Sequence, residues 1–341
     1  IKLYLDPAHA SLEERYLQAV KRSLDEYARW FGTYPYSTLS VVVPPAGAGG
    51  AAGMEYPTLI TAWAADEADP GNELERVIAH EIGHQYFYGM VANNEFEEAW
   101  LDEGFTSYAE DKVMQTVYGI APPLTIESSY ITAPQPLVKA SWNYPNHQVY
   151  AENVYTRAKL VLYGIERTIG EETMRKVMRT YFGKYRFKHP TTADFLHVLE
   201  QVTNRSWDDY FDQFVYDGRM VDYAIRSIRS VPVRLDGSAA YENRIVVESR
   251  DGIHGSADIL IHFQDGTTAK QTWDGRKGET EFKIISRSPV SWALIDPERT
   301  IVLENRHINN FMKTEVDERQ KIRLNVGITK LIEGLIQWFA W

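Results

Sequence analysis

The sequence predicts an α+β protein, in which a mainly helical part with a small sheet precedes an all-β sandwich. Two observations carry this prediction. Apolar residues recur at helical spacing over much of residues 11–216, whereas Asp-Gly pairs separate short β-type runs after Gly218. With 341 residues, 44% of them apolar, the chain is long enough for about two globular domains.

The chain begins with a helix and two short strands. A helix is predicted at 11–31, where Ser11 and Glu14 have the spacing of a capping box. The β-type run at 39–43 is stopped by two prolines, and a second run follows at 59–63. We therefore expect a small sheet beside the first helix.

Helices dominate the next part of the chain. They are predicted at 73–90, 102–118, 152–169, 171–185, 192–203 and 206–216. The proline-rich segment 119–150 is long for a loop, and we expect it to form a lid or the wall of a cleft.

The last third of the chain changes character. Tight-turn signals occur at Asp236-Gly237, Asp251-Gly252, Asp265-Gly266 and Asp274-Gly275. The β-type runs between them predict a small sandwich. We place a catalytic domain at 1–220, the β-sandwich at 221–310 and a tail at 311–341.

The tail carries an apolar stripe over 326–341. Its 16 residues are too few to span a bilayer, so we expect a helix that docks on the protein or anchors at a membrane surface. An extracytoplasmic or membrane-associated location is favoured. Because the chain opens on Ile1 without a signal peptide, we expect it to be a piece of a longer protein. The sequence carries no signal for an oligomeric state.

The composition limits the metal ligands, nucleophiles and partners that the protein can have. The chain contains no cysteine, which leaves histidines and carboxylates as the strong metal ligands and excludes thiol nucleophiles. The net charge is −11, and no Lys/Arg-rich run is present. Nucleic acid is therefore excluded as a partner.

The strongest motif is His80-Glu81-Ile82-Gly83-His84 within a predicted helix. Residues four apart lie one turn above each other, so both imidazoles can face a single ion. Glu81 then lies beside the open coordination position, as the general base of a zinc peptidase does.

A third ligand is expected from the next helix. Glu103 lies in Trp100-Leu-Asp-Glu-Gly-Phe105, and the eighteen residues 85–102 separate it from His84. This interval allows an antiparallel helix pair to bring both segments to one ion. Glu97, Glu98 and Asp102 are alternatives on the same segment.

Several blocks together resemble the gluzincin aminopeptidases related to alanyl aminopeptidase and leukotriene hydrolase. The blocks are HEIGHQYFYG, WLDEGFTSYAE with its Glu103 separated from His84 by eighteen residues, GMEYP at 53–57, YTRAKLVL from Tyr155 and FDQFVY from Phe211. The resemblance implies a thermolysin-like catalytic domain, with one zinc ion held by His80, His84 and Glu103. The thermolysin group itself has a different interval and lacks the GMEY-type block.

The resemblance also implies roles for further residues. Gly53, Met54 and Glu55 match the substrate-binding block, in which the glutamate grips the free α-amine of a peptide. Tyr155 matches the tyrosine that hydrogen-bonds the oxyanion, with Tyr150 as its nearest competitor. Glu110 is a candidate for orienting a ligand histidine.

Two departures from the family pattern are visible. Tyr56 replaces the asparagine of the GxMEN block, which puts selectivity for the amine end in doubt. The N-terminal β domain and the C-terminal helical domain of many members have no counterpart in the chain, so we expect a more open cleft.

The sequence therefore predicts a zinc-dependent aminopeptidase acting on peptides, with Glu81 as general base and Tyr155 stabilising the oxyanion. Two alternatives are an endopeptidase with the same site and a non-catalytic scaffold. Retention of Glu81 and Tyr155 beside all three ligands disfavours the scaffold.

Overall fold

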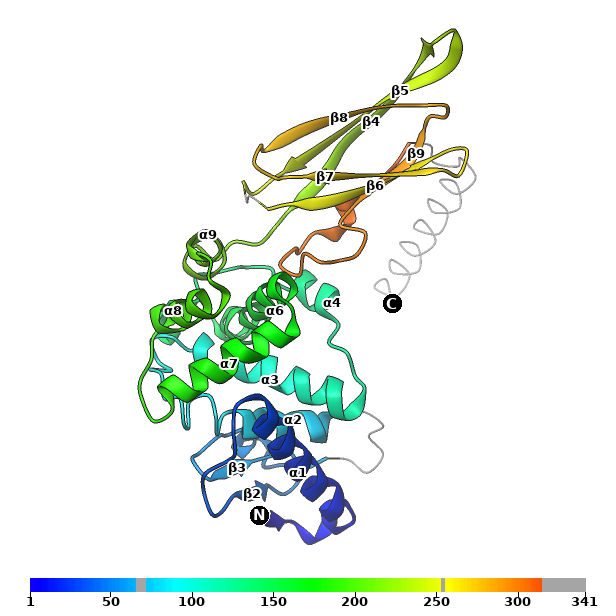
Figure 1. Ribbon diagram of the computed structural model, residues 1–341. Helices are drawn as coiled ribbons and strands as arrows, with labels where there is room; N and C mark the ends of the chain where they lie inside the picture. Colours follow the sequence, from blue (N-terminus) through cyan, green and yellow to red (C-terminus); the bar gives the residue numbers. More distant parts are fainter. Residues whose placement is uncertain (66–71, 253–254, 315–341) are drawn as a thin grey trace. The chain divides into compact units, whose positions relative to one another are not determined.

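The computed structural model describes residues 1–65, 72–252 and 255–314. Within these residues the chain forms two compact units, one of Ile1–Val221 with Thr300–Asn305 and one of Asp222–Arg299 with the residues from Arg306 onward (Figure 1). None of the described helices has the length and apolar character that a membrane span requires. The predicted tail helix at 326–341 lies outside the described residues.

A small parallel sheet opens the first unit. Its strands, in the order β1-β2-β3, are β1 (Lys2–Leu5), β2 (Ser40–Val43) and β3 (Leu59–Thr61). Val41, Val43 and Ile60 are buried, as expected of β-branched residues between a sheet and a helix. Both predicted strands of the sequence are thus present, and β1 was missed.

Helix α1 (Glu13–Trp30) follows the short 3-10 helix η1 (Pro7–Leu12). It buries one apolar face, which includes Tyr16, Val20 and Tyr27. The predicted capping box is wrong, because the N-cap position is Leu12 and no side chain caps α1.

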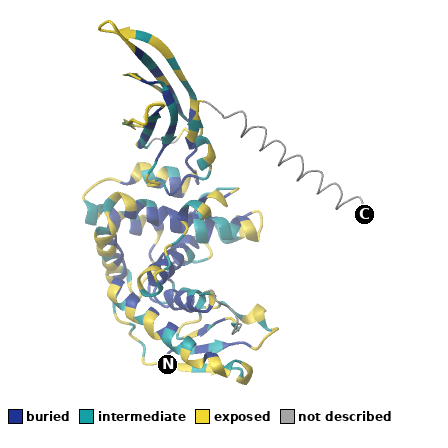
Figure 2. Ribbon diagram, turned by 90° about the vertical axis from the view of Figure 1, so that its right-hand side faces the viewer, coloured by how far each residue is buried: buried dark blue, intermediate teal, exposed yellow. Residues whose placement is uncertain are grey.

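The remaining helices of the first unit come from residues 73–216. Their bounds are α2 (Glu73–Gly83), α3 (Trp100–Tyr118), α4 (Leu124–Ser129), α5 (His147–Ala151), the π-helix η4 (Glu152–Arg157), α6 (Ala158–Ile169), α7 (Glu171–Tyr185), α8 (Thr192–Thr203), α9 (Asp208–Phe211) and the π-helix η5 (Asp212–Tyr216). Helix α3 packs against α1, α2, α6 and η4. Figure 2 shows that buried residues gather on the inward-facing sides of these helices.

Helix α2 is shorter than predicted. The sequence pattern extends to residue 90, but the helix ends at Gly83 with His84 as its C-cap. Tyr88 adopts a φ of 94°, which no helical residue can have. The chain therefore turns after His84 and returns toward α3.

The second unit is built from antiparallel strands (Figure 1). In its described residues one sheet has the order β4-β5-β8 and another the order β10-β9-β6-β7. The strands are β4 (Tyr223–Leu235), β5 (Ser238–Ser249), β6 (Ala257–Phe263), β7 (Thr268–Trp273), β8 (Glu279–Ser286), β9 (Val290–Ile295) and β10 (Phe311–Lys313).

Alternating burial along β6, with Ile259 and Ile261 inside, shows that each sheet presents one face to a shared core. The buried Asn243 of β5 accepts a hydrogen bond from the backbone N–H of Val290 at 3.1 Å, which links the two sheets. The Asp236-Gly237 pair forms the β4–β5 turn, as the sequence predicted.

Candidate active site

Two glycines allow the helices of the site to approach closely. A Cβ atom on Gly83 of α2 would lie 2.8 Å from Thr106 Cγ2 of α3. A Cβ atom on Gly104 of α3 would lie 2.4 Å from the Cβ of Ala158 on α6. Real Cβ atoms do not come this close, so these positions require glycine. The glycines of the HEIGH and LDEGF segments thus set the spacing of α2, α3 and α6.

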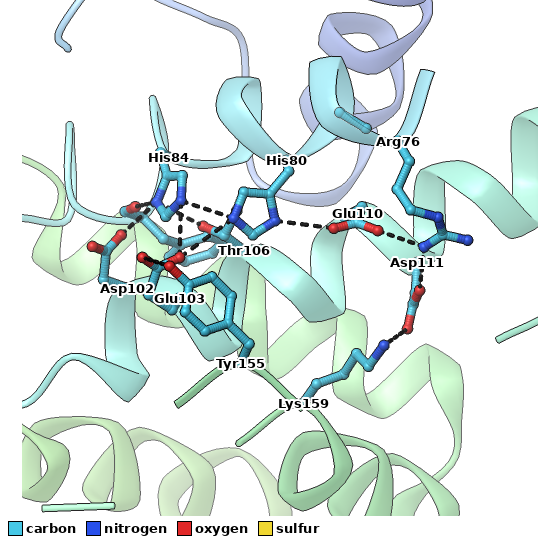
Figure 3. A network of polar contacts seen from close by, with 12 residues as sticks. Arg76, His80, His84, Asp102, Glu103, Thr106, Glu110, Asp111, Tyr155 and Lys159 are labelled. Carbon is cyan, nitrogen blue, oxygen red and sulfur yellow. Dashed lines mark hydrogen bonds and ion pairs between the residues drawn. The ribbon is translucent and has the colours of Figure 1, made fainter. Parts of the chain in front are cut away.

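Three potential ligand atoms converge between α2 and α3 (Figure 3). The Nε2 atoms of His80 and His84 lie 3.1 Å apart. Glu103 Oε2 lies 3.3 Å from the first and 3.2 Å from the second. The structure therefore brings together the three residues that the sequence analysis named as ligands, and their ligand atoms lie within 4.8 Å of one another.

Each histidine is held at its other ring nitrogen by a carboxylate. His84 Nδ1 lies 2.6 Å from Asp102 Oδ1, and His80 Nδ1 lies 3.0 Å from Glu110 Oε2. A carboxylate at Nδ1 keeps the proton there and turns the lone pair of Nε2 toward the centre. With the proton on Nδ1, each imidazole can bind a metal ion through Nε2.

Charge accumulates strongly in this site. Burial opposes protonation of His80, but hydrogen bonds to Glu103 and Glu110 outweigh it and raise its pKa to about 9. Burial likewise opposes a charge on Glu103, yet the two histidines lower its pKa. A bound cation could stabilise the Glu103 carboxylate in place of these protons.

Glu81 lies beside the converging atoms. Its side chain is only 5% exposed, and its Oε2 atom has no hydrogen-bond partner. Burial raises the pKa of Glu81 to about 7. A buried carboxylate oxygen without a partner is costly unless a ligand or solvent molecule uses it. Two histidines, one glutamate and this free oxygen fit a zinc ion of the catalytic kind, which has three protein ligands and an open position.

A cavity of about 620 Å³ opens over these residues. Its wall includes Glu55, Glu81, Glu103 and Tyr155. The segment 119–150 is not a continuous loop as predicted, because it contains α4 and the start of α5. Pro123 and Glu127 from this segment line the cavity, as expected of a cleft wall.

The segment 53–55, which the resemblance implies for substrate binding, lies beside β3. Gly53 donates its backbone N–H to Thr61 O at 3.0 Å, and Thr61 returns a hydrogen bond to Met54 O at 2.9 Å. Gly53 and Glu55 line the cavity, whereas the half-exposed Met54 is not part of its wall. Sequence reasoning did not find Glu95, whose carboxylate lies within 4.8 Å of those of Glu55 and Asp102.

Tyr155 reaches the centre from the π-helix η4. Its hydroxyl donates to Glu103 Oε1, and its ring stacks on that of His80 with the centroids 5.9 Å apart. Burial, reinforced by Glu103, raises the pKa of Tyr155. The competing Tyr150 packs against the same apolar cluster of Tyr144 as Tyr155 does, and its ring lies edge-on to that of Tyr155, but the hydroxyl that donates to Glu103 is that of Tyr155. Tyr155 is therefore the hydroxyl that the structure places at the ligands.

Sequence reasoning also missed several charged residues behind the ligands. Asp102 was considered only as an alternative ligand, and Arg76, Asp111 and Lys159 were not named at all. Helical spacing could have indicated two of them, since Arg76 precedes His80 by four positions and Lys159 follows Tyr155 by four.

Comparison with known proteins places this site in a family. The model of the peptidase family M1 domain matches residues 15–214. The chain belongs to peptidase family M1. The resemblance to the gluzincin aminopeptidases is thereby confirmed, and the family is one of zinc metallopeptidases.

Curated relatives of this M1 chain carry aminopeptidase names. It is 25% identical over 258 residues to a protein named probable aminopeptidase 2 of Sulfurisphaera tokodaii, covering 69% of the chain and 32% of that protein. It is 24% identical over 252 residues to human glutamyl aminopeptidase, covering 68% of the chain and 26% of that protein. The chain thus spans about a third or less of the length of these relatives.

A solved structure supports the fold of both units. The crystal structure of Legionella pneumophila aminopeptidase A in complex with aspartic acid superimposes with a TM-score of 0.65 at 15% identity, covering 92% of this chain and 36% of that one. The predicted α+β class of this M1 chain is confirmed.

Proposed function

We propose that this M1 chain is the catalytic part of a zinc-dependent aminopeptidase that removes residues from the N-termini of peptides. The observation that carries the proposal is the convergence of His80, His84 and Glu103 beside the unpartnered oxygen of Glu81. One zinc ion would be held by the two Nε2 atoms and the Glu103 carboxylate. When bound, zinc supplies Lewis acidity, which polarises a carbonyl and lowers the pKa of water toward ~7.

The residues of the chain perform the remaining tasks. Glu81 accepts a proton from the attacking water and returns it to the leaving nitrogen, so that the amide becomes a carboxylic acid and an amine. Tyr155, whose hydroxyl already lies at Glu103, donates a hydrogen bond to the oxyanion that develops on the scissile carbonyl. Asp102 and Glu110 keep the two imidazoles oriented during the reaction.

Preference for a free amine is supported by the charge beside the ligands. Carboxylate oxygens of Glu55, Glu95 and Asp102 lie within 4.8 Å of one another. Burial, followed by the neighbouring carboxylates of Glu55 and Glu103, raises the pKa of Glu95, and His84 opposes this shift. An α-ammonium group bound at Glu55 would be stabilised by these carboxylates.

The test is hydrolysis of a panel of aminoacyl fluorogenic amides with free amines beside their N-acetylated counterparts, with the zinc content assayed. Cleavage of the free amines alone supports the aminopeptidase. Cleavage of blocked peptides would instead indicate an endopeptidase, and a zinc-loaded but inert chain would contradict a catalytic role for the chain by itself.

Glu55→Gln refines the test. Loss of the charge should reduce kcat/KM for free-amine substrates by about 10–100-fold, because a charge-assisted hydrogen bond contributes ~1.5–3 kcal/mol. Glu97→Gln, at an exposed position on the segment before α3, is the matched control and should retain activity.

A further inference from the structure

A row of charged side chains leads away from the ligand His80 along the cavity (Figure 3). We call these residues the ion chain: Glu110, Arg76, Asp111, Lys159 and Glu127. The row begins at Glu110, which holds His80 Nδ1 through one carboxylate oxygen. The other oxygen of Glu110 lies 2.5 Å from Arg76 Nη1. Glu110 is thus fixed from both sides.

Arg76 is shared between two carboxylates. The nitrogen that holds Glu110 at 2.5 Å also lies 3.2 Å from Asp111 Oδ1. Asp111 has its own cation on the other side, since Lys159 Nζ lies 3.0 Å from Asp111 Oδ2. The ion chain ends at Glu127 Oε1, which is 2.9 Å from Lys159 Nζ.

The inner ion pairs are shielded from water. Asp111 is 1% exposed and Lys159 is 7% exposed. Removing one partner of a buried pair leaves an uncompensated charge, which is strongly unfavourable. An Asp111 deprived of Lys159 would therefore draw the nearest remaining cation, Arg76, which now lies closer to Glu110.

Lys159 also joins the helices of the site. It is on α6, one turn beyond Tyr155 on the adjoining η4, and both side chains line the cavity. Its partner Asp111 is on α3, which also carries Glu103. The Lys159–Asp111 pair thus fastens the helix that presents Tyr155 to the helix that presents a ligand.

We propose that Lys159 is a positioning residue of the metal centre: by neutralising Asp111 it leaves Arg76 to hold Glu110, and Glu110 in turn fixes His80. Through the same pair it fixes the helix of Tyr155. This inference rests on the proposed zinc site, and its test uses zinc affinity, which can be measured whether or not the substrate class is correct.

The experiment compares Lys159→Met with Lys112→Met in the whole chain. Lys112 is a similarly buried lysine, 3% exposed, paired with Glu166 at 2.7 Å and not among the residues that line the cavity. Both variants should lose stability to urea by similar amounts. Only Lys159→Met should bind zinc more weakly, by about 10–100-fold in competition with a chelator, and show a lower kcat. Lys159→Gln gives the same comparison if the Met variant does not fold.

Variants of Asp111 distinguish a positioning role of Lys159 from a general effect on stability. Asp111→Asn breaks the same ion pair from the other side, but it leaves Arg76 free to hold Glu110, so zinc affinity should stay close to that of the wild type. In the double variant Lys159→Met/Asp111→Asn, affinity should recover from the low value of Lys159→Met. A residue that acts only through general stability would show no such recovery.

The possible outcomes distinguish a failure of the proposed zinc site from a failure of the role proposed for Lys159. A wild-type chain that binds no zinc would overturn the metal centre, and the role of Lys159 with it. A wild type that binds zinc, with Lys159→Met equal to it in zinc affinity, would overturn the role of Lys159 alone. Equal weakening in Lys112→Met would do the same.

Discussion

The Nδ1 atom of His84 lies 2.6 Å from Asp102 Oδ1, and both side chains are almost completely buried. Asp102 immediately precedes the ligand Glu103 in α3. In the proposed zinc site, neighbouring residues on this helix would therefore act in two ways, Glu103 as a ligand and Asp102 as the support of the ligand His84. With its proton held on Nδ1 by Asp102, His84 would offer Nε2 to the metal.

Replacement of Asp102 should accordingly weaken zinc binding. We expect Asp102→Ala to reduce zinc affinity by about 10–100-fold, because the partner that orients the imidazole is lost. Chelator competition measures this change. Glu98→Gln is the control: Glu98 accepts hydrogen bonds from Thr192 at the start of α8, so its loss should lower stability and leave zinc affinity unchanged. Equal zinc affinity in Asp102→Ala and the wild type would contradict the role.

The sequence could identify the acidic segment but not the role of each acid in it. Glu97, Glu98, Asp102 and Glu103 all lie at a suitable distance from the HEIGH motif. What separates them is the residue at which α3 begins, because each position along a helix turns by about 100°. With the start at Trp100, Glu103 faces both imidazoles and Asp102 faces His84. Without family resemblance, single-sequence patterns locate such a boundary only to within ~2–4 residues.

Some features of the fold could likewise be predicted from the sequence and others could not. The helical and β parts, the strands at 39–43 and 59–63 and the Asp-Gly hairpin turn at 236–237 follow from local patterns, and the structure contains them. The end of α2 and the ion chain do not follow from local sequence patterns. The end of α2 is followed by Tyr88 at a positive φ, and the ion chain joins residues far apart in the sequence; local propensity reports neither feature.

Glu81→Gln should separate metal binding from turnover. The amide preserves the shape of the side chain but cannot accept a proton, so we expect zinc content to be retained and kcat to fall by at least about 10²–10⁴-fold. Metal analysis of the purified variant and fluorogenic hydrolysis measure the two properties. Loss of zinc in Glu81→Gln would mean that this residue helps to hold the ion, and undiminished turnover would remove Glu81 from the mechanism.

Tyr155→Phe removes the hydroxyl that lies at Glu103. Loss of one hydrogen-bond donor to an oxyanion lowers kcat by about 10²–10³-fold. We expect a fall of this size in Tyr155→Phe, with little change in KM. The neighbouring Tyr150 provides a close control, because its ring contacts that of Tyr155 but packs with the apolar cluster. Tyr150→Phe should keep most of the activity. A larger loss of kcat in Tyr150→Phe than in Tyr155→Phe would show that Tyr150, and not Tyr155, contacts the oxyanion.

Buried tyrosines should make the chain sensitive to alkali. Burial raises the pKa of Tyr144 to about 12 from its ordinary value of 10. Between these two pH values the unfolded chain releases the proton and the folded chain retains it. The stabilising effect of the protonated form is therefore complete below pH 10 and is lost as the pH rises toward 12.

Urea unfolding at pH 9 and pH 11 tests this expectation. Tyr144→Phe should be less stable than the wild type at pH 9, because it lacks the hydrogen bond to Pro136 O. It should lose less stability than the wild type between the two pH values. Tyr4→Phe alters an exposed ring and should follow the wild type throughout. Parallel losses in Tyr144→Phe and the wild type would show that Tyr144 does not cause the alkaline sensitivity.

Gly53 lies beside the proposed general base Glu81. Its φ is 69°, and a Cβ atom there would lie 3.4 Å from Trp63 Nε1 and 3.7 Å from Glu81 Oε1. Gly53→Ala should therefore destabilise the fold by about 1–2 kcal/mol through backbone strain and also reduce kcat by placing a methyl group in van der Waals contact with the Glu81 carboxylate. Gly47→Ala isolates the first effect, because Gly47 also has a positive φ but no atom lies within 4 Å of its added Cβ. If both variants lose stability and only Gly53→Ala loses turnover, the contact with Glu81 is the cause. Equal turnover in the two variants would show that the space beside Glu81 tolerates a methyl group.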